Sequence, residues 1–388
     1  MARVVLGIEA LLADPPAWAA TARVGLLTNQ GAVDASFRPT DEQVAGLFGS
    51  RLKALFSPQH GFWSDKQDNM VESPDARHPL LKIRIFSLYG QTRQPTAEML
   101  GGLDVLVVDL QDVGCRVYTY IQTLKLVVEA CAEHGLKVVV LDRPNPLGRS
   151  IEGNLLEPSC FSFVGLFALP MRHGLTIGEM ARLIKAEGAD CELEVVAMCG
   201  YDPQAYFEAT GLKWVIPSPN MPLVETAMVY PGQVLFEGTN ISEGRGTTRP
   251  FEIFGAPFVD PYRLASRMAE YALEGVFFRP LYFEPTFNKH AGKLCGGLQI
   301  HVLDRTIFRP YRTSLALLQA LAQLWPEETA FKDPPYEYEF ERRPLDLILG
   351  RPDLADLVVS GRDLMELEEG WAGDLAEYDR SRQEYFLY

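Results

Sequence analysis

Residues 236–252, which read FEGTNISEGRGTTRPFE, gather side chains that can bind or transform a polar ligand. Carboxylate, guanidinium, hydroxyl and amide groups stand close together in a stretch interrupted by three glycines. A solvated surface loop is the commoner explanation, in which Arg245 simply pairs with Glu243. Likewise, Arg249 would serve Glu252. The alternative is a site for a polar, partly anionic small molecule, because Arg can bind a carboxylate through two parallel hydrogen bonds.

Acid–base chemistry on a polyhydroxylated ligand is the reaction class that these residue types favour. Glycoside hydrolysis needs a proton donor at the leaving oxygen, together with a second carboxylate or a substrate amide that meets the positive charge of the transition state. The candidate carboxylates, at expected strand ends or in the 236–252 stretch, are Asp109, Asp112, Asp142, Glu237, Glu243 and Glu252. Aromatic residues that could stack on a sugar ring, although such residues more often belong to a core, are Phe62, Trp63, Tyr118 and Tyr120.

Basic side chains offer partners for an anionic or hydroxylated substrate. The guanidinium groups that could bind a carboxylate, each of which alone is more often a salt-bridge partner, are Arg143, Arg172, Arg245 and Arg249. His60, His173 and His290 lie in polar turns. A lone histidine is more often structural, but three of them near expected loop ends favour a catalytic role for one.

Several other chemistries lack their motifs. No G-x-G-x-x-G or G-x-x-x-x-G-K-[ST] stretch is present to cradle a phosphate, and no G-x-S-x-G stretch to present a nucleophilic serine. The six cysteines form no C-x-x-C pair and the six histidines have no metal-ligand spacing, so we expect free thiols and no structural zinc. We therefore expect neither a metal nor an organic cofactor.

The charge and hydropathy of the chain narrow its partners and its location. The net charge of −15 argues against nucleic acid or an anionic membrane surface as a partner, because both require basic patches. The acidic start MARVVLGIEALLADPP is not a secretory signal, and no run approaches the roughly 18 apolar residues of a membrane span. We expect a cytoplasmic protein that inserts into no membrane, unless a signal outside these residues directs export. If the ligand is anionic, its pocket must be locally basic.

Apolar, β-branched runs alternate with helical stretches in the N-terminal half of the chain. The expected strands are residues 23–29, 52–58, 83–90, 104–111, 137–144 and 192–198. The expected helices are 120–135 and 176–188, the second with a capping box formed by Thr176 and Glu179. Strands that are apolar on both faces and alternate with helices are typical of a doubly wound sheet. We predict an α/β fold with a doubly wound, mostly parallel sheet.

The C-terminal part of the chain is predicted to form a second, smaller α/β domain. Residues 214–232 are rich in proline, and we expect them to be an extended passage between the domains. The elements expected beyond this passage are a helix around 261–275, strands at 276–283 and 295–304, a helix at 313–325 and a final helical tail. The chain is therefore predicted to divide into domains 1–225 and 226–388.

Polar turns follow four of the expected strands. They are residues 29–31, 58–62, 111–114 and 142–146. The carboxyl ends of parallel strands lie along one edge of an open sheet, and ligands bind in the crevice outside them. Any strand must end in a turn, but the mixture of carboxylate, imidazole, guanidinium and amide groups favours a site. We therefore expect these four loops to meet in space.

Eight motifs, taken in their order along the chain, carry a resemblance to a known family. They read LFSPQHGF, SLYGQTRQPTAEML, DLQDVGCRVYTYI, LDRPNPLG, RHGLTIGEMA, PSPNMP, YPGQVLFEGTNISEGRGTTRPFE and NKHAG. Together they resemble the NamZ-type exo-β-N-acetylmuramidase family over nearly the whole chain. The resemblance implies a Rossmann-like N-terminal domain, a smaller C-terminal domain and a site in the cleft between them. It also implies removal of terminal N-acetylmuramic acid from the non-reducing end of peptidoglycan-derived saccharides.

The implied substrate carries hydroxyls, an acetamido group and a lactyl carboxylate, which the polar groups of residues 236–252 could serve. We expect Arg245 and Arg249 to hold the lactyl carboxylate and His60 to orient the reacting groups. The expected catalytic residues are Glu243 first, then Asp112 or Asp65, and His60. The further residues expected to bind substrate are Asn29, Gln59, Tyr118, Tyr120, Asp142, Arg143, Asn145, Arg172, His173, Asn220, Asn240, Arg245, Thr247, Thr248, Arg249 and His290.

Gln59 departs from the family pattern. The family has Pro-Glu-His-Gly, with the Glu as the favoured catalytic residue, where this chain has Pro-Gln-His-Gly at residues 58–61. An amide neither donates nor accepts a catalytic proton at neutral pH. Another carboxylate could take the role, with Asp65, Asp68 and Glu72 in the following segment as candidates. Alternatively, the chain performs a different hydrolase or transferase reaction, or it binds an amino sugar without cleaving it.

Overall fold

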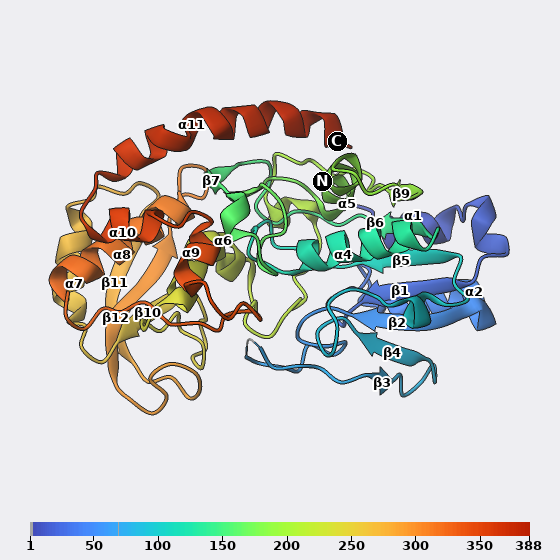
Figure 1. Ribbon diagram of the computed structural model, residues 1–388, viewed down its shortest axis with the longest axis horizontal. Helices are drawn as coiled ribbons and strands as arrows, with labels where there is room; N and C mark the ends of the chain where they lie inside the picture. The colour runs from blue at the N-terminus through green and yellow to red at the C-terminus, as the bar shows by residue number, and fades with distance from the viewer. Residues whose placement is uncertain (1–2, 69) are drawn as a thin grey trace.

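The apolar runs of the N-terminal half form one seven-stranded sheet (Figure 1) in the computed structural model, which describes residues 3–68 and 70–388. The strand order is β3-β4-β2-β1-β5-β6-β9, and every neighbouring pair is parallel except β3 with β4. The strands are β1 (Val24–Thr28), β2 (Leu52–Ser57), β3 (Ala76–Arg77), β4 (Arg84–Ser87), β5 (Val105–Asp109), β6 (Lys137–Leu141) and β9 (Leu193–Val196). All six strands expected in this half are confirmed.

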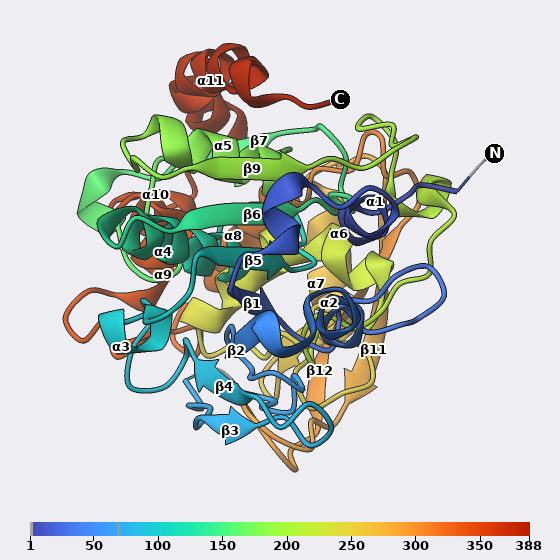
Figure 2. The ribbon, with the colours of Figure 1, turned by 90° about the vertical axis from the view of Figure 1, so that its right-hand side faces the viewer.

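Helices cover both faces of this sheet. The helices of the larger domain are α1 (Gly7–Ala13), α2 (Thr40–Phe48), α3 (Ala97–Leu100), α4 (Tyr120–Glu133) and α5 (Ile177–Ala186). Figure 2 shows α4 on one side of the strands and α1 and α2 on the other. Neighbouring residues of β5 alternate accordingly, because Leu106 and Val108 belong to one core and Val105 and Val107 to another. The doubly wound α/β prediction is confirmed, as is the capping box of Thr176 with Glu179 on α5.

The C-terminal part forms a second, smaller domain around a three-stranded antiparallel sheet of order β10-β12-β11. Its strands are β10 (Ile253–Ala256), β11 (Val276–Phe283) and β12 (Cys295–Val302). Its helices are α6 (Val224–Gln233), α7 (Pro261–Ala269), α8 (Pro310–Leu324), α9 (Pro344–Leu349), α10 (Leu354–Val359) and α11 (Leu364–Ser381). A hairpin of β7 (Glu152–Leu155) and β8 (Pro170–Arg172) packs against α8 and α11 from the N-terminal half of the sequence.

The expected extended passage at 214–232 is wrong in its second half, because α6 begins at Val224. All ten residues of α6 except Glu225 are buried, and the helix packs on α8. Gly232 lies so close to this neighbour that a Cβ atom would stand 2.0 Å from the Pro310 carbonyl oxygen. Burial of this apolar surface stabilises a helix that Pro231, near its C-terminal end, would otherwise disfavour.

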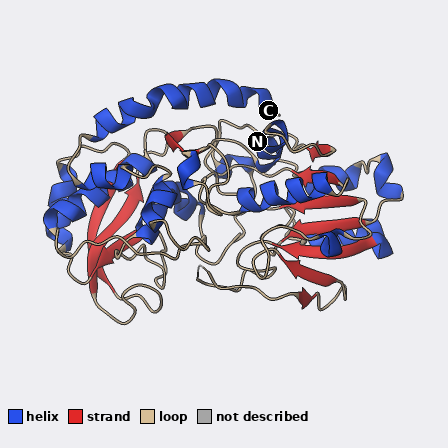
Figure 3. Cartoon of the chain, in the orientation of Figure 1, coloured by secondary structure: helices blue, strands red, loops and turns tan. Residues whose placement is uncertain are grey.

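The two domains share one continuous apolar core. It contains Leu124 of α4, Tyr230 of α6 and Leu317 of α8, among many others. Figure 3 shows that loops and turns make up much of the region between the two sheets. The loops that follow the parallel strands are therefore held against the smaller domain by the packing beneath them. Among the described residues, no helix has the length and apolar character needed to cross a membrane.

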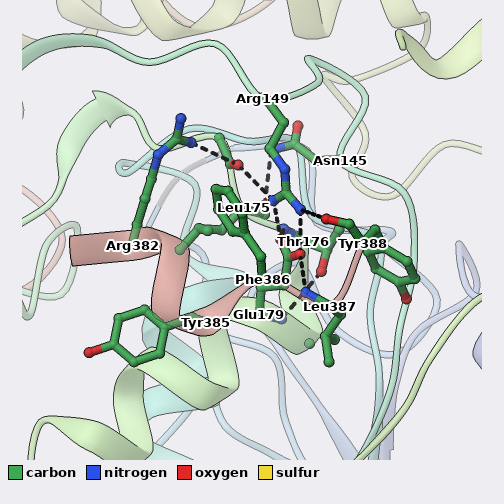
Figure 4. A network of polar contacts seen from close by, with 12 residues as sticks. Asn145, Arg149, Leu175, Thr176, Glu179, Arg382, Tyr385, Phe386, Leu387 and Tyr388 are labelled. Atoms are coloured by element: carbon green, nitrogen blue, oxygen red, sulfur yellow. Dashed lines mark hydrogen bonds and ion pairs between the residues drawn. The ribbon is translucent and has the colours of Figure 1, made fainter. Parts of the chain in front are cut away.

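Helix α11 runs along the molecule from the smaller domain to the larger one (Figure 1). The residues after it lie against α5 (Figure 4), where the Leu387 N–H donates to Glu179 Oε1 at 2.9 Å. Arg149 forms a buried ion pair with the same carboxylate, and its guanidinium carbon lies 3.8 Å from the centre of the Phe386 ring. One buried carboxylate thus caps α5 and holds both Arg149 and the final segment of the chain.

Arg149→Ala should destabilise the protein by about 3–5 kcal/mol, because Glu179 would stay buried without its cation. We expect the loss to appear as a lower Tm in a thermal unfolding scan. Arg380→Ala provides the matched control, since its ion pair with Glu377 lies on the exposed face of α11. Equal decreases in Tm for the two variants would contradict the role assigned to the buried pair.

Candidate active site

A pocket lies where the loops that follow β2 and β5 meet the smaller domain. Those two strands are the neighbours of β1 in the sheet. The chain adds β2 and β4 on one side of β1 and β5, β6 and β9 on the other. An open α/β sheet binds ligands at the point where the strand order reverses in this way. The space in the pocket is about 440 Å³ when the open solvent at its mouth is included, so the enclosed part is far smaller. It is lined by Gln59, His60, Val117, Tyr118, Thr119, Tyr120, Val164, Ser218, Asn220, Met221, Tyr230, Glu237, Arg245, Phe251, Tyr336 and Glu337.

The pocket contains six of the residues expected from the sequence to bind or act on substrate. They are Gln59, His60, Tyr118, Tyr120, Asn220 and Arg245. Asn29 stands directly behind them, because its side-chain amide donates to the Tyr120 hydroxyl at 2.7 Å and to the Pro217 carbonyl at 2.8 Å. Loops after β1, β2 and β5 therefore meet, but the residues of the β5 loop that line the pocket are 117–120 rather than the expected 111–114, and the expected turn at 142–146 does not line it. Their partners come from a passage near residue 220 and from the smaller domain.

Glu337 is the carboxyl group that Gln59 contacts. The Gln59 side-chain amide donates to Glu337 Oε1 at 3.0 Å and to the Tyr89 hydroxyl at 3.1 Å, and its own oxygen accepts from the Thr119 hydroxyl at 2.5 Å. Tyr89 donates to Glu337 Oε2 at 2.5 Å. Glu337 is 3% exposed, so these contacts replace water around it.

The environment of Glu337 lets it hold a proton near neutral pH. Burial is the largest influence and raises its pKa to about 7, and the nearby Glu237 carboxylate acts in the same direction. The donors Tyr89 and Gln59, with Arg245 further away, oppose the increase without cancelling it. Burial and the adjacent carboxyl raise the pKa of Tyr89 as well, so its hydroxyl stays protonated.

Arg245 lies between two carboxylates. It donates to Glu237 Oε1 at 2.6 Å, and its Nε stands 3.2 Å from Glu243 Oε1. The second oxygen of Glu237 accepts from the Tyr336 hydroxyl at 2.7 Å. Lys289 completes the cluster through an ion pair with Glu243 at 2.7 Å. Two cations and two anions balance here, so the pocket is not strongly basic.

Glu243 is poorly suited to the proton-donor role expected for it. It lies in a neighbouring hollow that also contains Glu237 and Arg245, and it is 2% exposed. Although burial acts to raise its pKa, Lys289 and Arg245 together lower it below the ordinary value. A carboxylate that two cations keep ionised accepts hydrogen bonds but has no proton to give. The structure therefore places Glu243 behind the pocket as the partner of two cations.

His60 presents a neutral imidazole to the pocket. Its Nδ1 lies 2.7 Å from the Lys66 carbonyl oxygen, which can only accept, so Nδ1 carries the hydrogen. Burial is the main cause that lowers the pKa of His60 to about 4, and Arg245 contributes. At neutral pH, Nε2 is consequently free of its proton and can accept a hydrogen bond. This fits the orienting role expected from the sequence.

Other expected residues lie at strand ends but serve the fold. Asp112 accepts from the Gly114 N–H at 2.7 Å and stands 3.3 Å from His173 Nε2. Arg143 pairs with Asp109, and it also donates to the Val33 carbonyl at 3.0 Å. These groups tie neighbouring loops to one another, and they do not line the pocket that contains Gln59. Polar side chains gather at strand ends partly because the buried polar groups of these loops need hydrogen-bond partners.

The polar side chains of the turn after β6 likewise form hydrogen bonds within the protein. Asp142 accepts from the Thr176 hydroxyl, the Gly178 N–H and the Tyr388 hydroxyl, all at 2.8 Å, and burial raises its pKa to about 6. Asn145 donates to the Leu175 carbonyl at 2.9 Å. Arg172 donates to the Leu147 carbonyl. The expected substrate contacts of Asp142, Asn145 and Arg172 are therefore not supported, because these side chains face the loops before α5.

The 236–252 stretch divides between the pocket and the surface. Arg249 forms an ion pair with Glu252 at 3.0 Å and is half-exposed, as the simpler explanation of this stretch required. The backbone oxygen of Asn240 contacts His290 Nε2 at 2.7 Å, so these two hold each other. Thr247 and Thr248 line an open groove that adjoins the pocket at Asn220. Asp65 is exposed and pairs with Lys66 at 2.6 Å, outside the pocket.

Glu337, the acid beside Gln59, was not among the site residues expected from the sequence. It lies in the segment YEYEF, where acidic and aromatic residues alternate and no helix or strand forms. Alternation of this kind is typical of an exposed edge strand, so it gives no sign of a pocket. Tyr336, in the same segment, and Tyr89, which follows β4, were also absent from the expected site residues. A weak signal was the Pro334–Pro335 pair, which directs the following residues away from regular structure.

Within the described ranges, no group of three or more His, Cys, Asp or Glu side chains is arranged to hold a metal ion.

Comparison with known proteins identifies the family. A family model described as exo-β-N-acetylmuramidase NamZ, N-terminal, matches residues 24–225, and one described as exo-β-N-acetylmuramidase NamZ, C-terminal, matches residues 228–388. The chain belongs to the NamZ family. The resemblance drawn from the eight motifs is thus confirmed.

Individual relatives are similar to this NamZ-family chain in sequence and structure over its full length. The peptidoglycan β-N-acetylmuramidase NamZ of Bacillus subtilis (strain 168) is 40% identical over 390 aligned residues, which cover 100% of this chain and 92% of the relative. Two crystal structures of DUF1343 family proteins from Bacteroides fragilis NCTC 9343 cover 100% of this chain and 99% of their own. One is 33% identical with a TM-score of 0.89, and the other is 25% identical with a TM-score of 0.79.

The imidazole of His60 should stay neutral, with its hydrogen on Nδ1, at all pH values above about 5, because its pKa is lowered to about 4. Long-range ¹H–¹⁵N NMR spectra would report the tautomer and the titration, and a His60→Asn variant would assign the signal. A titration midpoint near the ordinary value of about 6.5 would contradict the neutral form.

Proposed function

We propose that this protein hydrolyses the glycosidic bond of a terminal N-acetylmuramic acid at the non-reducing end of peptidoglycan-derived saccharides. Membership of the NamZ exo-β-N-acetylmuramidase family supports the activity. The observation that carries the proposal for this chain is one pocket that brings together the Glu337 carboxyl, the Glu237 carboxylate and the Arg245 guanidinium. Glycoside hydrolysis needs carboxyl groups at the scissile bond, and an anionic sugar needs a cation.

The pocket offers a partner for each part of the proposed sugar. Arg245 is the cation among the lining residues and would face the lactyl carboxylate. The lone pair on His60 Nε2, with the Ser218 hydroxyl and the Asn220 amide, would bind hydroxyl and acetamido groups. Rings such as Tyr118 would pack on the apolar face of the sugar.

The balanced charge of the Arg245 cluster sets how strongly the lactyl group would bind. Glu237 and Glu243 already share the guanidinium, so a bound carboxylate would compete with them rather than enter an unneutralised site. We therefore expect the lactyl group to contribute discrimination between sugars rather than most of the affinity. The contacts with the acetamido and hydroxyl groups would supply most of the affinity.

The reading of this chain as a protein that binds an amino sugar without cleaving it depended on Gln59. The Gln59 amide, however, contacts the buried carboxyl group of Glu337, which favours an enzyme over a protein that only binds. The pocket consequently contains an acid, Glu337, beside the position at which the family resemblance implied one.

Purified protein should release N-acetylmuramic acid from a saccharide that carries this sugar at its non-reducing end. A matched saccharide ending in N-acetylglucosamine, which lacks the lactyl carboxylate, should react with a kcat/KM lower by roughly 10-fold or more, the size of a lost charge-assisted hydrogen bond. Chromatographic detection of the released sugar measures both rates. Heat of binding in a calorimeter without product between about pH 4 and 8 would sink the enzymatic proposal and favour a binding protein.

A further inference from the structure

We propose that Glu337 of the smaller domain is the acid that protonates the leaving oxygen, and that Gln59 of the larger domain is the positioning residue that holds it. The assignment rests on the proposed function and adds to it the identity and the origin of the proton donor. The two residues lie 278 positions apart in the sequence, so the acid exists as a working group only when the domains are together.

The orientation of the Gln59 amide follows from its three contacts. The Thr119 hydroxyl can donate to an amide oxygen, which fixes the oxygen end at 2.5 Å. The NH₂ end must then face Glu337 and Tyr89, to which it donates at 3.0 Å and 3.1 Å. Gln59 therefore acts as a pure donor toward the acid and holds Glu337 Oε1 in a fixed place.

Tyr89 is the second fixed donor. Its hydroxyl oxygen receives the Gln59 amide and the Met70 backbone N–H at 3.2 Å, so its lone pairs are occupied and its own hydrogen points to Glu337 Oε2. Both oxygens of Glu337 are thus held by neutral donors. Such donors stabilise the carboxylate that remains after proton transfer, without demanding that it be ionised beforehand.

The charged and titratable groups that face Glu337 leave its proton available. Burial is the main cause that raises the pKa of Glu337 to about 7; the Tyr89 hydroxyl lowers the pKa, Glu237 raises it, and Gln59 and Arg245 lower it. A general acid works best when its pKa lies near the working pH, because it is then largely protonated and still acidic enough to transfer the proton. Glu237 is differently placed, since its two oxygens accept from Arg245 and Tyr336.

The proposed step balances without any further reagent. As the bond between the anomeric carbon and the glycosidic oxygen breaks, the Glu337 proton passes to that oxygen and the remaining saccharide leaves as an alcohol. Water then adds its oxygen to the anomeric carbon and gives up a proton, which restores the Glu337 acid. The transient carboxylate is held by the Gln59 N–H and the Tyr89 O–H.

An amide at position 59 also removes a competitor for the proton. A glutamate there would place a second carboxyl group about 3 Å from Glu337, and two such groups share one proton because both cannot ionise at that distance. With Gln59, the proton belongs to Glu337 alone. The exchange of glutamate for glutamine at this position thus changes which group carries the proton and leaves an acid in the pocket.

Glu337→Gln tests the acid directly through its dependence on the leaving group. For a natural saccharide, whose leaving alcohol must be protonated, we expect kcat/KM to fall by about 100-fold or more. For a nitrophenyl glycoside of N-acetylmuramic acid, from which nitrophenolate leaves without being protonated, we expect a decrease below about 10-fold. The control is Glu341→Gln, an identical exchange at an exposed position of the same segment, which should leave both rates unchanged.

The outcomes separate this assignment from the proposed function. An active wild-type protein with equal losses on both substrates, or with no loss, would overturn the role of Glu337 alone. A wild-type protein inactive on both substrates would overturn the proposed function and the assignment with it. Calorimetric binding of N-acetylmuramic acid to Glu337→Gln checks that the variant keeps its fold.

The role of Gln59 is tested by the pH profile of kcat/KM. Wild-type activity should decline as the pH rises through about 7, because Glu337 then loses its proton. In Gln59→Glu, the second carboxyl group should move this decline to higher pH, and Tyr89→Phe should do the same by removing a donor from the carboxylate. Lower activity with an unmoved profile in both variants would show a merely structural role and refute the positioning assignment.

Discussion

A carboxylate taken out of water must be met by a cation or by hydrogen-bond donors, and the kind of partner decides what that carboxylate can do. Glu243 meets Lys289 at 2.7 Å, and the ion pair keeps it ionised and holds it in place. Glu337 meets the amide of Gln59 and the hydroxyl of Tyr89, which are neutral. Its charge is therefore less completely supported, and its proton stays exchangeable near neutral pH. The division of labour among the buried acids follows from this difference.

The same constraint explains why most polar residues at the strand ends do not face the pocket. Asp109 is buried at the end of β5 and is met by Arg143 from the turn after β6, so each satisfies the other. Asp142 collects three donors from the segment around α5 and the end of the chain. Loops packed between two domains lose access to water, and their own polar groups then become partners for one another.

The sequence was informative where a local pattern determines the structure. Continuous apolar runs located the six larger strands of the parallel sheet, and the rule for strand ends pointed to the turn after β2, which contributes Gln59 and His60 to the pocket. The extended reading of 214–232 failed because burial against α8 outweighs the effect of Pro231. The division at residue 225 stays a prediction, since a shared core and a crossing helix leave no simple boundary.

The acid of the pocket could not be found in this way. Glu337 stands in a segment without regular structure, and its importance comes from partners in the other domain. The sequence also does not show which charged residues form ion pairs with one another. Glu243 and Arg249 therefore looked as free to contact a substrate as any other charged residue. What distinguishes them is three-dimensional: Glu243 lies between two cations, and Arg249 is held by Glu252 near the surface.

The segment after α11 has a consequence for the order of events on the ribosome. Chain growth delivers β1 to β9 and α5 well before residues 382–388, yet the Tyr388 hydroxyl is one of the three donors to Asp142 and the Leu387 N–H completes the contacts of Glu179. Until residues 387 and 388 have been made and have docked, the nascent larger domain must leave both acids partly hydrated. Docking of this late segment is therefore the event that seals this side of the sheet.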